Sequence, residues 1–246
     1  MTNKGDDGKE VGPLLKGLNW VYDKSLQGIA KFEGAEEFAR NYTDSYPSPE
    51  DAIDSLVSWQ VTNAAVAGFV TGLGGVLTLA AAIPANLASV LFIQLRMIAG
   101  IAHIRGYDLK SDQVRSLAFI CLTGSAAADV AKNVGIRIGT KLTEQAVSKI
   151  SGATIRRINQ AVGFRLATKA GTTGAVNLTK FIPFVGGLVS GAVDAAATQA
   201  VASSAKKFFP ARPPSRKRPR KPGNVQGSAG GRKRASPGKP KKPKSD

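Results

Sequence analysis

A long run without charge constrains this chain most. No Asp, Glu, Lys, Arg or His occurs from Ser55 to Leu95, which exceeds the roughly 20 residues that one membrane-spanning helix needs. Composition argues against insertion, because Ala and Gly outnumber Leu, Ile and Phe in this run and Thr62, Asn63 and Asn86 add polar groups. We therefore expect a buried apolar helical hairpin, broken by Gly and Pro, inside a bundle. Two inserted spans over residues 60–105 are the alternative.

Apolar residues recur at helical spacing through most of the chain, and no alternating strand pattern stands out. The predicted fold class is therefore all-α, a multi-helix bundle. Residues 1–12 are predicted to be a disordered polar N-terminus, residues 13–47 an amphipathic helix and loop, residues 48–208 the helical domain, and residues 209–246 a disordered tail.

Local signals place several helix ends. Pro13 suits a first helical turn. Ser48, followed by proline and two acids, is typical of a helix start. Gly106 is expected to end one helix, and Ser111 to cap the next.

Positive charge is concentrated at the C-terminus. Of the 34 Lys and Arg residues, 15 lie from Lys206 onward with one acid, Asp246, so this segment carries +14 of the formal net charge of +17. It is rich in Pro and Gly and poor in apolar residues, which predicts disorder. The cations of its basic clusters are Arg216, Lys217, Arg218, Arg220, Lys221, Arg232, Lys233, Arg234, Lys239, Lys241, Lys242 and Lys244.

Such a polybasic tail binds polyanions without reading a sequence. Each Lys or Arg near anionic lipid contributes about 1 kcal/mol, and the same cations neutralise the phosphates of DNA or RNA. Residues 210–246 contain no aromatic side chain that could stack on bases. We therefore expect an anionic membrane surface as the partner, with Phe208 and Phe209 as a small apolar foothold. Nucleic acid is the alternative.

Further cations lie within the predicted helical domain. Between residues 134 and 170 basic and apolar residues recur at helical spacing, which predicts a basic stripe on helices that lies on anionic membrane or faces solvent. Its members are Arg137, Lys141, Lys149, Arg156, Arg157, Arg165 and Lys169. Gly135 and Gly139, four residues apart, would let a neighbouring helix approach closely.

Two blocks of sequence carry a family resemblance. One is GFVTGLGGVLTLAAAIPANLASVLFIQLRMIAGIAHIRGYD, and the other is FIPFVGGLVSGAVDAAATQAVASSAKKFF. In this order they resemble the EcsC family over residues 50–208. The family-like residues are Gly72, Gly74, Gly75, Pro84, Arg96, Gly106, Tyr107, Asp108, Pro183, Gly186 and Gly187.

The resemblance implies a bacterial, mostly helical protein that acts at or near the membrane, with a link to membrane transport or secretion. It brings no established catalytic residues. One position departs from the family pattern, because Ala82 and Ile83 precede Pro84 where the family carries an acid. A shared activity that depends on that acid would be missing here.

Arg96, His103 and Tyr107 are spaced seven and four residues apart, so one helix would present all three on one face. They form a candidate site for an anion or a lipid headgroup, with Arg96 as the fixed charge and His103 as a titratable partner. The alternative is that Arg96 pairs with Asp129 or Asp194 inside the bundle while His103 packs.

Little in the sequence points to catalysis or to a cofactor. One His and one Cys cannot complete a tetrahedral zinc site, and the glycines at 72–75 lack the spacing of a phosphate-binding loop. No nucleophile motif accompanies the single His, and Cys121 is expected in the core. We therefore expect a non-enzymatic protein without metal or cofactor. The acidic start lacks the features of a secretory signal, which predicts a cytoplasmic protein at the inner face of the membrane.

Overall fold

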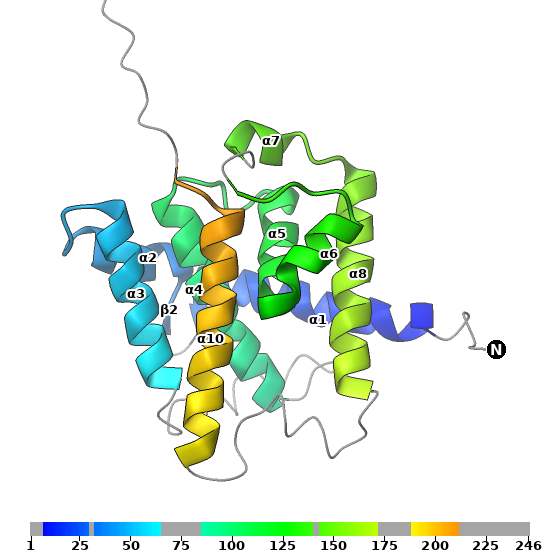
Figure 1. Ribbon diagram of the computed structural model, residues 1–246, viewed down its shortest axis with the longest axis horizontal. Helices are drawn as coiled ribbons and strands as arrows, with labels where there is room; N and C mark the ends of the chain where they lie inside the picture. Colours follow the sequence, from blue (N-terminus) through cyan, green and yellow to red (C-terminus); the bar gives the residue numbers. More distant parts are fainter. Residues whose placement is uncertain (1–6, 30–31, 65–84, 140–142, 172–187, 212–246) are drawn as a thin grey trace, which may run out of the picture. The chain divides into compact units, whose positions relative to one another are not determined.

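The computed structural model describes residues 7–29, 32–64, 85–139, 143–171 and 188–211. Within these residues helices dominate, which confirms the predicted all-α fold (Figure 1). In chain order the elements are α1 (Asp7–Gln27), β1 (Gly28–Ile29), β2 (Phe32–Glu33), α2 (Ala35–Thr43), α3 (Pro49–Ala64), α4 (Ala85–Ile104), α5 (Asp112–Leu122), the 3₁₀ turn η1 (Gly124–Ala126), α6 (Ala127–Asn133), α7 (Glu144–Ser148), α8 (Gly152–Gly171) and α10 (Leu188–Phe208).

The first helix begins earlier than the sequence indicated. α1 begins at Asp7, so Pro13 lies inside it and not in its first turn. A proline inside a helix costs about 3 kcal/mol, because it removes one backbone hydrogen bond and crowds the preceding turn. Tertiary packing offsets this cost, since α1 contacts α4 and α8 and fully buries Leu18, Val21 and Tyr22.

A short hairpin divides the segment that was predicted as one helix. Gly28 has a φ of +87°, and a Cβ there would lie 2.6 Å from the Phe32 carbonyl oxygen. A Cβ on Gly34 would lie 2.1 Å from the Leu26 carbonyl oxygen. Only glycine fits both positions. The chain therefore turns after α1, Ile29 pairs with Phe32 across the antiparallel hairpin, and α2 starts in a new direction.

Two predicted helix starts are confirmed. Ser48 precedes α3, and its hydroxyl accepts a hydrogen bond from the backbone N–H of Asp51 at 3.1 Å. Ser111 precedes α5, and its hydroxyl accepts one from the backbone N–H of Val114 at 3.2 Å. Both satisfy donors that a helix leaves unpaired at its N-terminus.

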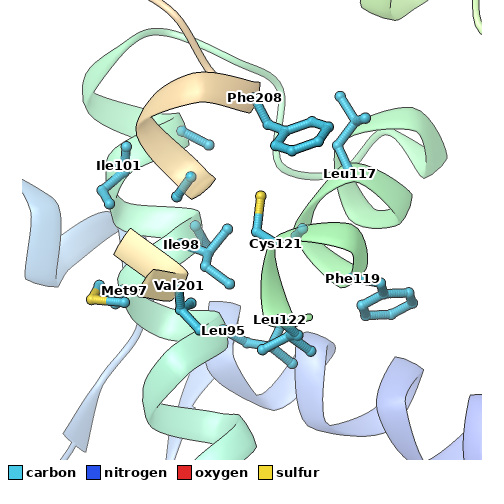
Figure 2. Close-up of a cluster of buried hydrophobic side chains, with 14 of the residues drawn as sticks. Leu95, Met97, Ile98, Ile101, Leu117, Phe119, Cys121, Leu122, Val201 and Phe208 are labelled. Atoms are coloured by element: carbon cyan, nitrogen blue, oxygen red, sulfur yellow. The ribbon is translucent and has the colours of Figure 1, made fainter. Parts of the chain in front are cut away.

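α4 lies at the centre of the packing. It contacts α1, α2, α3, α5 and α10, and Figure 2 shows side chains of α4, α5 and α10 meeting in one apolar cluster. Met97, Ile98 and Ile101 of α4 are fully buried there. Cys121 of α5 lies in the same cluster, which confirms that it is a core residue, and burial raises the pKa of its thiol. The thiol is therefore held in its unreactive protonated form.

Much of the charge-free run lies outside the described residues. α3 ends at Ala64 and α4 begins at Ala85, and these two helices contact each other and α10. In the described parts of the chain, no single helix is long and apolar enough to cross a membrane. α5 together with Gly124–Asn133 passes that test by length and composition as a pair bent by 117°.

Candidate functional site

Arg96 lies deep in the bundle, against aromatic rings. Its guanidinium carbon is 4.2 Å from the centre of the Phe38 ring on α2, 5.3 Å from that of Phe32 and 6.0 Å from that of Phe92. Among the described residues, the side chain donates one hydrogen bond, to the Glu33 backbone carbonyl oxygen at 3.4 Å, which is long for such a bond. The ring faces therefore provide much of the favourable environment for this cation.

Burial disfavours the charge on Arg96. It lowers the pKa of the guanidinium to about 10, and the negative charge of Glu33 opposes this effect only in part. Within the described residues, the Nε–H of Arg96 is buried and has no hydrogen-bond partner. The alternative of an ion pair with Asp129 is wrong, because Asp129 is exposed on α6 and the hydrogen bond of Arg96 goes to Glu33. The side chain of Asp194 lies outside the described residues.

The structure does not place Arg96, His103 and Tyr107 on one helix. α4 ends at Ile104, and Gly106 adopts a φ of +76°. The Gly106 and Tyr107 N–H groups then bond the carbonyl oxygens of His103 and Ala102, at 2.7 and 2.9 Å. This is a Schellman ending, in which only the glycine adopts the left-handed conformation without strain. Gly106 thus ends the helix as predicted, and Tyr107 leaves the face that Arg96 and His103 share.

Tyr107 turns toward the end of α10 instead. Its ring packs edge-on against the Phe209 ring, with 5.2 Å between centres, and its hydroxyl donates to the Pro210 carbonyl oxygen at 3.3 Å. Asp108 is exposed and accepts a hydrogen bond from the Lys110 backbone N–H at 2.9 Å. These family-like residues shape the connection between α4 and α5 and hold the end of α10.

Arg105 is the residue that sequence reasoning missed. It is buried and donates to the Lys206 carbonyl oxygen at 2.7 Å and to the Phe209 carbonyl oxygen, both at the C-terminal end of α10. It also forms an ion pair of 2.6 Å with Glu50 in the first turn of α3. We call these four residues the Arg105 cluster. The sequence around Arg105 could not indicate this cluster, because the partners of Arg105 lie 55 or more residues away in the chain.

The Arg105 cluster fixes the place where the basic tail leaves the bundle. Lys206 adds an ion pair with Asp54 of α3, and Figure 1 shows α3, α4 and α10 side by side. Phe208 and Phe209 are buried, so the prediction that they form an exposed apolar foothold is wrong. Both rings are part of the buried core. The predicted start of the tail at residue 209 is therefore early, and residues 212–246 lie outside the described residues.

The predicted basic stripe is not continuous along helices. Gly135 and Gly139 have φ values of +80° and +90°, so α6 ends before them and Arg137 lies in the connection to α7. They form no helix face for close packing. Lys149 follows α7, and only the later members of the stripe lie on α8.

Four members of the stripe are exposed: Arg137, Lys149, Arg156 and Arg157. These four make no ion pair within the described part of the chain. Arg165 is partly buried. Lys141 and the side chain of Lys169 lie outside the described residues. The exposed positive charge of the predicted stripe therefore comes from α8 and from the loops on either side of α7.

The described residues hold no group of three or more His, Cys, Asp or Glu side chains that could bind a metal ion.

The sequence profile of the EcsC protein family matches residues 17–213. The chain belongs to the EcsC protein family. No curated protein and no solved structure matches it. The match begins within α1, well before residue 48, where local patterns placed the start of the EcsC-like domain. The contacts of α1 with α4 and α8 agree with this wider extent.

Several EcsC family-like residues lie outside the described residues. They are Gly72, Gly74, Gly75, Pro84, Pro183, Gly186 and Gly187. Of the remaining four, Arg96 is enclosed by aromatic rings, whereas Gly106, Tyr107 and Asp108 form the connection after α4.

Proposed function

We propose that this EcsC family protein is a non-enzymatic, peripheral protein of anionic membranes. Its polybasic tail and its exposed basic residues supply the attraction to lipid. The proposal places the protein at the cytoplasmic face of the membrane, in a role linked to membrane transport or secretion.

The exposed cations carry this proposal. Arg137, Lys149, Arg156 and Arg157 have no acidic partner in the described chain, and no Asp or Glu occurs between Glu144 and Asp194. Each cation near an anionic bilayer contributes about 1 kcal/mol. The tail contributes a further +14. The attraction of the tail to lipid therefore adds to that of the exposed cations of the helical unit. Two membrane-binding signals together can hold a protein that neither signal would hold alone.

The tail begins at a fixed point of the helical unit. The Arg105 cluster and the ion pair of Lys206 with Asp54 tie the last turn of α10 to α3 and α4. Because the tail is covalently joined to the helical unit, a membrane bound by the tail would be present at high effective concentration for the basic residues of that unit. Binding by the tail would therefore favour simultaneous binding by the basic residues of the helical unit.

Cell fractionation tests the proposal. Full-length protein should pellet with membranes and leave them in high salt. A variant that ends at Arg212 keeps every described contact of α10 and should stay largely in the soluble pool. Reversing the charge of the tail clusters should have the same effect, whereas a tail of scrambled sequence and unchanged charge should still bind.

Other outcomes would overturn the proposal. Unchanged membrane binding after charge reversal would exclude the tail as the source of attraction. Resistance of both lengths to alkaline carbonate would instead support insertion of residues 60–105. Release by nuclease would support nucleic acid as the partner of the tail.

A further inference from the structure

The charges of the helical unit are separated between two sides. Residues 32–62, which form β2, α2 and most of α3, hold seven acids and one base. Two of these acids, Glu50 and Asp54, form ion pairs with residues outside this range. The five acids without an ion pair among the described residues are Glu33, Glu36, Glu37, Asp44 and Asp51, and with the single base Arg40 they leave a formal charge of −4. We call residues 32–62 the acidic side.

The opposite charge lies on α6, α7 and α8 and on the loops between them. Residues 127–139 and 143–166 hold six bases and two acids, which is a formal charge of +4. The bases are Lys132, Arg137, Lys149, Arg156, Arg157 and Arg165, and the first five of them are exposed. We call residues 127–139 and 143–166 the basic side.

Other helices lie between the two sides. α8 packs against α1, α5 and α6, whereas α2 and α3 pack against each other and against α1, α4 and α10. Figure 1 shows α2 and α3 at one side of the helical unit and α7 and α8 at the other. Packed helices lie about 8–10 Å apart, so an intervening helix separates the sides by more than the Debye length of about 8 Å at physiological ionic strength. A charged surface in contact with one side therefore acts only weakly on the other.

We propose that the helical unit lies on an anionic lipid bilayer with the basic side against the lipid phosphates and the acidic side toward water. This inference rests on the proposed membrane function and names the surface that makes the contact. An anionic surface attracts the basic side and repels the acidic side, so contact through the basic side has the lowest free energy. There the exposed Arg156 and Arg157 donate charge-assisted hydrogen bonds to phosphate oxygens.

Energy transfer to the bilayer tests this orientation in the full-length protein. Cys121 is the only cysteine and is buried, so Gln160→Cys on the basic side and Asn41→Cys on the acidic side each supply an exposed thiol for a donor dye. Vesicles of phosphatidylglycerol and phosphatidylcholine carry the acceptor dye on a small fraction of their lipids. The donor at position 160 should be quenched more than the donor at position 41, because transfer falls steeply with distance. Equal quenching would overturn the inference.

A charge exchange between the two sides supplies the matched control. Arg156→Glu and Arg157→Glu combined with Glu37→Lys and Asp44→Lys change four exposed residues, keep the net charge and the tail, and bring both sides to a formal charge of zero. The new acids lie near the start of α8 and one new lysine lies at the end of α2, where helix dipoles favour them. Equal thermal unfolding would show that folding is intact.

The exchanged protein should still bind anionic vesicles through its tail. The difference in quenching between positions 160 and 41 should disappear, because neither side is then attracted more than the other. A difference that persists in the exchanged protein would show that these charges do not set the orientation, and the inference would fail.

The outcomes separate this inference from the proposed function. If the unaltered protein binds anionic vesicles with equal quenching at the two positions, the membrane function stands and the orientation is wrong. If the unaltered protein does not bind such vesicles, both proposals fail. Donors that are quenched by acceptor-labelled duplex DNA and not by vesicles would overturn the lipid assignment.

Discussion

Arg96 and Arg105 are both buried, but Arg105 has three hydrogen-bond acceptors within the described residues and Arg96 has one. Arg105 donates to two carbonyl oxygens at the end of α10 and pairs with Glu50. Arg96 has one long hydrogen bond and three aromatic rings around it. Within the described residues, the Nε–H of each of the two arginines is buried without a hydrogen-bond partner. A buried charge stabilises a protein only when its partners repay the loss of water. The two arginines should therefore respond oppositely to removal of their charge.

Replacing Arg105 should be costly. Arg105→Met leaves the carbonyl oxygens of Lys206 and Phe209 without their donor, and we expect the free energy of unfolding to fall by about 2–4 kcal/mol. Glu50→Gln should cost about 1 kcal/mol or less, because the Glu50 side chain is 52% exposed and water screens its charge. Urea denaturation measures both. Equal losses in the two variants would show that the stability comes from the ion pair with Glu50 and not from the hydrogen bonds of Arg105 to the end of α10.

Replacing Arg96 should cost little. Since burial lowers the pKa of Arg96 to about 10, keeping the charged form opposes folding at every pH below that value, and this penalty shrinks only as pH rises from about 10 toward the ordinary value. Arg96→Met keeps the packing against Phe38 and removes the penalty. We expect a urea midpoint at pH 7 equal to or above that of the original protein. A loss of more than about 2 kcal/mol would mean that the aromatic rings stabilise the cation more than burial disfavours it.

At the scale of elements, helix ends that depend on neighbouring residues could be predicted from the sequence, whereas contacts between residues far apart in the chain could not. The caps at Ser48 and Ser111 and the end at Gly106 depend on atoms within a few residues, so their patterns were sufficient. The partners of Arg105 come from α3 and α10. No local pattern encodes such contacts. The exposed foothold predicted for Phe208 and Phe209 failed for the same reason, because distant elements bury both rings.

The hairpin between α1 and α2 shows how tertiary contacts decide a break. Glycines weaken a helix but do not dictate a turn. Here the backbone approaches Gly34 so closely that a Cβ would lie 2.1 Å from the Leu26 carbonyl oxygen. Such an approach occurs only once α1 and α2 have folded back on each other. The sequence therefore indicated a weak point in the helix, but not the direction in which the chain turns there.

Gly34→Ala should therefore disrupt the junction of α1 and α2. The added methyl group meets backbone, which cannot move aside easily, and we expect a loss of about 2 kcal/mol or more. The matched control is Gly152→Ala at the start of α8, where the nearest atom is the end of the Arg156 side chain at 3.8 Å. That change should be neutral or stabilise by up to about 1 kcal/mol. Thermal unfolding compares the two, and similar effects would contradict the close approach at Gly34.

At the scale of the whole molecule, the buried core and most of the positive charge lie in different parts of the chain. The chain divides after Arg212 into a helical unit, residues 1–212, and the tail that follows it. Nearly all of the net positive charge lies from Lys206 onward, whereas the buried core lies in the first unit. The last described contacts of the helical unit before most of the basic residues are those of Tyr107 with Phe209 and Pro210.

Two truncations locate this boundary. A chain ending at Arg212 keeps the Arg105 cluster and should unfold at the same temperature as the full-length protein, since a disordered tail would add no core contacts. A chain ending at Ala205 loses the buried rings of Phe208 and Phe209, each of which contributes roughly 1.5–3 kcal/mol, together with the acceptors of Arg105. That sum approaches the whole stability of an ordinary domain. Calorimetry should therefore show one cooperative transition for the first chain and none for the second, and a cooperative transition in the Ala205 chain would mean that the end of α10 is dispensable for the fold.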